Sequence, residues 1–137
     1  MVIDHVGLVV QSLEDGIQQW EKTFGYKQST EIVINTRQKV KVVFLDKEGS
    51  LQIKLIEPVD ETSPIFLFAK RGGGLHHLCF KCENLNEQIS SFDGKTTRVL
   101  VQPQPGEAFD NENIAFALAK NNLNIELIDT NKRAKRL

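Results

Sequence analysis

Residues 3–17 read IDHVGLVVQSLEDGI, and residues 75–89 read LHHLCFKCENLNEQI. The two stretches match at a single offset of 72 positions, which places His5 on His77. The same offset continues without a gap, because residues 51–57, LQIKLIE, fall on residues 123–129, LNIELID. A chance match would not hold one register over half of a chain, so the repeat decides the fold. We predict one duplicated module of about 60 residues, used twice.

Each module is predicted to form a strand, a helix and three further strands. Residues 2–10 are β-branched and apolar, as in a strand, and Ser12 can cap a helix that Gly25 ends. The first module is completed by predicted strands at 28–33, 40–45 and 51–56. The second repeats this order with a strand at 75–82, a helix at 84–92, and strands at 97–102, 113–119 and 122–128.

This order of elements predicts an α+β fold, in which two tandem βαβββ modules form a curved sheet around a cleft. The chain of 137 residues is long enough for one domain with one sizeable core. We therefore expect a single domain over 1–137, made of module 1 (about 1–60) and module 2 (about 75–130). A short helical linker with a proline at its first turn is expected between them.

Composition and charge exclude several classes of protein. A net charge of −1 gives no electrostatic reason to expect nucleic-acid binding. We also expect no membrane association, because no apolar run approaches the ~18 residues of a membrane span, and the start lacks the pattern of a signal peptide. Two cysteines, Cys79 and Cys82, form no disulfide framework. The sequence therefore predicts a cytoplasmic protein, whose basic tail at 131–137 is expected to be a frayed end.

The alternation of side chains along strands identifies the residues of the cleft. In the first strand the Val and Leu side chains should meet the helix, so that His5 points to the open side of the sheet. The repeat puts His77 at the same place in the second module, and it places Lys54 of the first module on Glu126 of the second. Two sheets facing each other would bring together His5, Lys54, His77 and Glu126. His76 falls on the opposite face and is interpreted as structural.

Several segments together resemble the vicinal-oxygen-chelate (VOC) superfamily, which includes glyoxalase I, extradiol dioxygenases, bleomycin-resistance proteins and methylmalonyl-CoA epimerase. The repeated histidine strand and the terminal Ile-Glu-Leu of residues 125–127 are shared with the whole superfamily. The segments 55–65, LIEPVDETSPI, and 70–77, KRGGGLHH, are most similar to the epimerase branch. The resemblance covers about residues 2–130, and it implies a glyoxalase-like fold.

The resemblance also implies a divalent metal, such as Co, Zn, Ni, Mn or Mg, bound by four side chains. Three of them map to His5, His77 and Glu126, but the fourth, normally Glu or Gln, is Lys54. A protonated lysine has no acceptor and cannot ligate a cation. Two outcomes compete. Either the three remaining groups hold the metal and Lys54, having lost its proton, acts as a base, or Lys54 pairs with Glu126 and replaces the cation.

The function implied by the resemblance is proton abstraction and return next to a thioester or carboxyl carbonyl. This chemistry favours an enzyme, an isomerase or a lyase, with Glu126 and Lys54 as catalytic residues. Glu107, Asp110 and Glu112 lie in a loop whose direction the sequence does not reveal, so no second base is assigned. The alternatives are a metal-free, non-catalytic binding protein similar to bleomycin-resistance proteins, and a glyoxalase I-like lyase. An acyl-CoA or a similar small molecule is the expected ligand, and a homodimer is the expected assembly.

Overall fold

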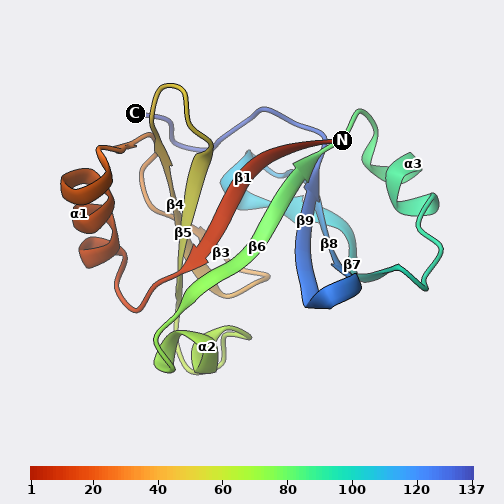
Figure 1. The fold of residues 1–137 in the computed structure, drawn as a ribbon, viewed down its shortest axis with the longest axis horizontal. Helices are drawn as coiled ribbons and strands as arrows, with labels where there is room; N and C mark the ends of the chain where they lie inside the picture. Colours follow the sequence, from red (N-terminus) through yellow and green to blue (C-terminus); the bar gives the residue numbers. More distant parts are fainter.

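The computed structural model describes all residues, 1–137, and contains one nine-stranded mixed sheet (Figure 1). The strands run in the order β2-β4-β5-β1-β6-β9-β8-β7, and β3 also pairs with β4. The elements of the first half are β1 (Val2–Val9), α1 (Leu13–Phe24), β2 (Lys27–Gln28), β3 (Val33–Asn35), β4 (Val40–Asp46), β5 (Gln52–Pro58) and α2 (Phe66–Lys70). Those of the second are β6 (Gly74–Lys81), α3 (Leu85–Ser90), β7 (Thr97–Gly106), β8 (Glu112–Ala119) and β9 (Leu123–Ile128).

The two halves of the sheet pair their strands in the same order. The first strands, β1 and β6, lie antiparallel to each other at the centre. Each is flanked by the last strand of its own half, because β5 runs parallel to β1 and β9 runs parallel to β6. Hairpins then add β4 to β5 and β8 to β9, while α1 and α3 lie at opposite ends of the molecule (Figure 1). The predicted α+β fold with a curved sheet is confirmed. The division into two modules stays a prediction, which this matching order supports.

The helices begin and end where local sequence allows. Ser12 Oγ accepts a hydrogen bond from the backbone N–H of Asp15, and Gly25 takes a left-handed conformation with φ of 74° to end α1. Asn84 caps α3 in the same way, with its side chain accepting from the N–H of Glu87. The α3 helix ends at Ser90, two residues before the end predicted at residue 92.

Apolar side chains of the sheet separate into two outer clusters and one inner cluster. One outer cluster packs α1 on the sheet through residues such as Leu13, Val43 and Leu55, with Val6 and Leu8 of β1 against them. The prediction that the Val and Leu face of the first strand meets the helix is therefore confirmed. The second outer cluster packs α3 on β8 and β9. The inner cluster lines the concave face, and it includes the Phe44 and Phe109 rings that surround the polar residues described below.

The carboxyl-terminal segment packs on the sheet, so the prediction of a frayed end is wrong. The N–H of Ala134 donates to the carbonyl of Ala108, and the N–H of Leu137 donates to that of Ser29. Arg133 is buried, with 7% of its surface exposed. The same segment breaks the strand predicted at 28–33 into β2 and β3. Between them, the N–H of Glu31 donates to the carbonyl of Lys135 rather than to β4, and Thr30 bridges Arg136. No helix in the structure is both long and apolar enough to cross a membrane.

Candidate functional site

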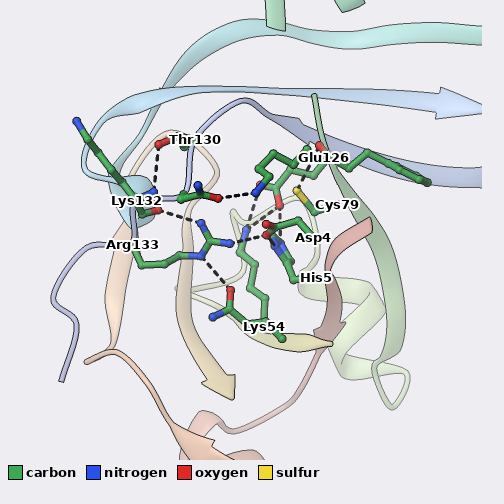
Figure 2. A network of polar contacts seen from close by, with 12 residues as sticks. Asp4, His5, Lys54, Cys79, Glu126, Thr130, Lys132 and Arg133 are labelled. Atoms are coloured by element: carbon green, nitrogen blue, oxygen red, sulfur yellow. Dashed lines mark hydrogen bonds and ion pairs between the residues drawn. The ribbon is translucent and has the colours of Figure 1, made fainter. Parts of the chain in front are cut away.

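The four predicted cleft residues lie together on the concave face of the central strands, and Figure 2 labels three of them, His5, Lys54 and Glu126. Strand register explains the arrangement, because Glu126 of β9 lies beside Cys79 of β6, and Cys79 lies beside His5 of β1. Gly7 of β1 lies between Lys54 of β5 on one side and His77 of β6 on the other. A Cβ atom at this position would overlap the His77 ring, so a glycine is needed there.

Glu126 is the centre of the cluster and is fully buried. Its Oε1 lies 2.9 Å from His5 Nε2 and 3.3 Å from His77 Nε2. Its Oε2 accepts a hydrogen bond of 3.1 Å from Nζ of Lys54, a residue that is only 3% exposed. Burial alone would raise the pKa of Glu126, but the charge of Lys54 and the two histidines hold it well below its usual value. Glu126 is therefore a carboxylate that accepts from its neighbours, and these contacts do not favour it as the base.

Two β-bulges place an additional residue beside each histidine. The register between β1 and β6 shifts once between Ile3 and His5 and once between Gly7 and Leu8, which leaves Asp4 and His76 without an opposite residue. Both fall on the histidine face as a result. Asp4 Oδ2 lies 2.8 Å from His5 Nδ1, and His76 Nδ1 lies 2.9 Å from His77 Nδ1. The prediction that His76 points to the opposite face is therefore wrong, because alternation fails at a bulge.

Arg133 lies behind His5, on the far side of Asp4, and no pattern in the sequence predicts this position. Its guanidinium pairs with Asp4 Oδ2 and donates to Gln52 Oε1 at 3.0 Å (Figure 2). It also stacks over the rings of Phe44 and Phe109, at 4.7 Å and 5.0 Å from their centroids. Since Asp4 contacts both Arg133 and His5, the carboxyl-terminal segment holds the His5 ring in place.

A pocket of about 250 Å³ opens beside the cluster. Its walls are largely apolar, with side chains from β4, β5, β7, β8 and the segment before α2, and Lys54, His76 and His77 are its ionisable residues. No Asp or Glu lines it. Glu107 instead accepts hydrogen bonds from Thr36, and Glu112 pairs with Lys132, so neither acidic residue faces the pocket. An apolar pocket with a few convergent polar groups is typical of a site for a small molecule.

The predicted metal ligands partly suit a divalent cation. One atom from each of His5, His77 and Glu126 lies within 4.8 Å of the others, and the buried His77 Nε2 faces Glu126 Oε1 without hydrogen-bond geometry. Lys54 does not suit it, because its ammonium contacts both oxygens of the only carboxylate in this set, at 3.1 Å and 3.4 Å. A cation bound by Glu126 would stand directly beside another positive charge in a buried site, which is unfavourable. The residues present therefore do not fit a divalent metal while Lys54 is protonated.

Comparison with known proteins gives one family match and several relatives. A family model described as Glyoxalase/Bleomycin resistance protein/Dioxygenase superfamily matches residues 4–116. The chain is 34% identical over 115 residues to the uncharacterized protein YqjC of Bacillus subtilis, which covers 83% of this chain and 80% of that protein. It is 31% identical over 100 residues to human mitochondrial methylmalonyl-CoA epimerase. That match covers 72% of this chain but spans only 56% of the human enzyme.

Several solved structures have a similar fold over most of this chain. Methylmalonyl-CoA epimerase from Mycobacterium tuberculosis superposes with a TM-score of 0.80 at 29% identity, covering 93% of this chain and 86% of that one. Another methylmalonyl-CoA epimerase, solved in complex with methylmalonyl-CoA and NH₄⁺, gives a TM-score of 0.79 at 26% identity, with 98% and 96% coverage. Relatives of this fold thus bind acyl-CoA molecules.

Proposed function

Because this chain belongs to the glyoxalase/bleomycin resistance protein/dioxygenase superfamily, we propose that it binds a CoA thioester, or a similar 2-substituted acid, and exchanges the proton next to the carbonyl. The observation that carries this proposal is the pocket beside the cluster, where an apolar wall meets one buried ammonium and two imidazoles. A short acyl group matches the apolar wall, and its carbonyl oxygen matches the polar end.

Lys54 supplies the positive charge that this chemistry needs. When the proton on C2 is removed, the C–H electron pair moves into the thioester carbonyl and its oxygen becomes anionic. An ammonium has three N–H donors, and the hydrogen bonds of the Lys54 side chain go only to Glu126. At least one N–H therefore remains for the ligand oxygen. A relative was solved in complex with methylmalonyl-CoA and NH₄⁺, and the protonated amine of Lys54 is a cation of similar chemistry.

His76 is the group best placed to accept the proton. It lines the pocket, its ring packs on Phe68 at 5.7 Å between centroids, and its only side-chain hydrogen bond uses Nδ1. Burial lowers the pKa of His76, so that the ring is neutral at pH 7 and its Nε2 can accept a proton. In the proposed step the C2 proton passes to His76 Nε2, and return of a proton to C2 restores the thioester.

A second function, ligand binding without catalysis, is favoured by one observation. The pocket has no carboxylate, which is the commonest partner for a proton transfer of this kind after histidine. If His76 is not the base, the same pocket would retain the ligand without exchanging its proton. The lyase alternative stays a prediction, since no contact in the structure favours it.

Deuterium exchange separates the two functions. The protein is incubated with methylmalonyl-CoA in D₂O, and incorporation at C2 is followed by proton NMR while binding is followed by calorimetry. We expect exchange above the uncatalysed rate in the wild type, loss of exchange in His76→Gln, and no change in Lys22→Glu, whose side chain lies on the exposed face of α1. Binding with no exchange would select the non-catalytic function. Absence of both would contradict the proposed class of ligand.

A further inference from the structure

The position of Lys54 leads to a conclusion that the family resemblance does not predict. The lysine occupies the place in β5 that corresponds to Glu126 in β9, 72 residues further along the chain. The side chains of Lys54 and Glu126 extend toward each other and meet in the centre of the cleft (Figure 2). We infer that the Lys54 ammonium is the resident cation of this cleft, and that it excludes the divalent metal for which the other three residues are arranged.

Charge balance in the buried cluster supports this inference. Lys54 pairs with Glu126, and Arg133 pairs with Asp4, so two positive groups are matched by two carboxylates. These four groups together carry no net charge. A divalent cation would leave two uncompensated positive charges in a region where Lys54, Glu126 and His5 are almost completely buried. The charges of these two ion pairs therefore cancel without any bound ion.

The aromatic rings around the two cationic side chains also favour a protonated amine over a metal ion. Lys54 Nζ lies 5.3 Å from the centroid of the Phe109 ring and 5.9 Å from that of Phe44. Arg133 stacks over the same two rings. Aromatic faces stabilise a desolvated ammonium, and they have no oxygen or nitrogen lone pair with which to bind a metal. The environment of Lys54 is thus suited to a protonated amine.

This arrangement also specifies how a ligand oxygen would be held, a point that rests on the proposed function. His77 Nε2 is buried and faces Glu126 Oε1 at 3.3 Å without hydrogen-bond geometry, and His77 lines the pocket together with Lys54. An oxygen between these two nitrogens would accept from the Lys54 ammonium and from a His77 N–H. The ligand class is therefore one with a carbonyl or carboxylate oxygen at the end of a short acyl group.

Metal binding tests the inference without any substrate. Co²⁺ is titrated into chelator-treated wild type, Lys54→Glu, Lys54→Leu and the surface control Lys22→Glu, with calorimetry and the visible absorption of bound Co²⁺ as readouts. We expect no stoichiometric binding by wild type or Lys22→Glu. Lys54→Glu should complete a set of two histidines and two carboxylates, and should bind at least about 100-fold more tightly than wild type. Lys54→Leu, which removes the charge but adds no ligand, should fall between them.

If a variant does not fold, Co²⁺ binding by the wild type still tests the inference. One equivalent of Co²⁺ bound by the wild type, with an absorption spectrum typical of nitrogen and oxygen ligands, would overturn the inference. So would a folded Lys54→Glu variant that binds no more tightly than the wild type. Neither result depends on turnover of methylmalonyl-CoA, so failure here is distinguishable from failure of the proposed function.

Discussion

The two strands that end the halves of this sheet, β5 and β9, present opposite charges to each other through Lys54 and Glu126. Two other positions around the cleft carry the same residue in both halves. His5 matches His77, and Phe44, whose ring lies 5.3 Å from His5, matches Phe116, whose ring lies 6.4 Å from His77. The framework of the cleft is therefore repeated, while its charge is not.

The difference shows which positions the fold requires and which it leaves free. Side chains alternate between the two faces of a strand, so a buried face needs an apolar residue at every second position. Both halves keep these apolar positions. At several positions of the cleft the halves differ: Lys54 against Glu126, Asp4 against His76, and Gly7 against Cys79. Each of these differences can be altered separately.

The largest effect is expected when the opposite charges are unmatched. Glu126→Leu leaves the buried Lys54 ammonium without its carboxylate, and should lower the free energy of unfolding by about 3–5 kcal/mol in urea denaturation. Adding Lys54→Leu should recover much of this loss, because neither charge then remains. The charge-reversed pair Lys54→Glu and Glu126→Lys should also be more stable than either single variant. A stable Glu126→Leu single variant would show that the two strands do not depend on each other's charge.

The second effect is a dependence of stability on pH. Burial lowers the pKa of His77 from 6.5 to about 4, against the opposing attraction of Glu126, while Lys54 and His5 act in the same direction as burial. Between these pH values the unfolded chain binds a proton at His77 that the folded chain does not. The free energy of unfolding should therefore decrease as the pH falls from 6.5 to 4, by up to about 3 kcal/mol. Urea denaturation across this range should show a shallower decline in His77→Gln.

The third effect compares the small residues between the strands. Gly7→Ala places a methyl group against the His77 ring, and should cost about 2 kcal/mol of stability while displacing that ring. Its counterpart Cys79→Ala only removes a buried sulfur atom, and should cost about 1 kcal/mol. Urea denaturation together with the imidazole signals in NMR would separate the two. Equal effects would mean that Gly7 does not set the position of His77.

The fourth effect concerns Arg133, whose ion pair with Asp4 and hydrogen bond to Gln52 both join it to the first half of the cleft. Arg133→Met removes the pair with Asp4 and the hydrogen bond to Gln52, and should cost about 1–2 kcal/mol. The control is Arg136→Met, since Arg136 is exposed and its side chain makes a single hydrogen bond of 3.3 Å. If both variants matched the wild type in thermal denaturation, the carboxyl-terminal segment would have no part in holding Asp4 and His5.

The repeat and the alternation of side chains were sufficient to predict the sheet and the meeting of His5, Lys54, His77 and Glu126. They failed for His76, because a bulge is a property of two paired strands and cannot be read from one of them. They failed again for Arg133, whose partners Asp4 and Gln52 lie 129 and 81 residues away along the chain. The break in the strand predicted at 28–33 has the same origin, since the carboxyl-terminal segment takes the hydrogen bonds of Glu31 and Ser29.

Away from the two bulges, the sequence by itself determined which side chains share a face, because that depends only on the period of two residues in a strand and on the 72-residue offset. It therefore placed Lys54 opposite Glu126. Only the tertiary structure decided that their charged atoms meet at 3.1 Å with almost no exposure to water. That contact depends on the pairing of β1 with β6 and on the burial that the inner cluster provides. Both are long-range effects, and no local pattern of residues encodes them.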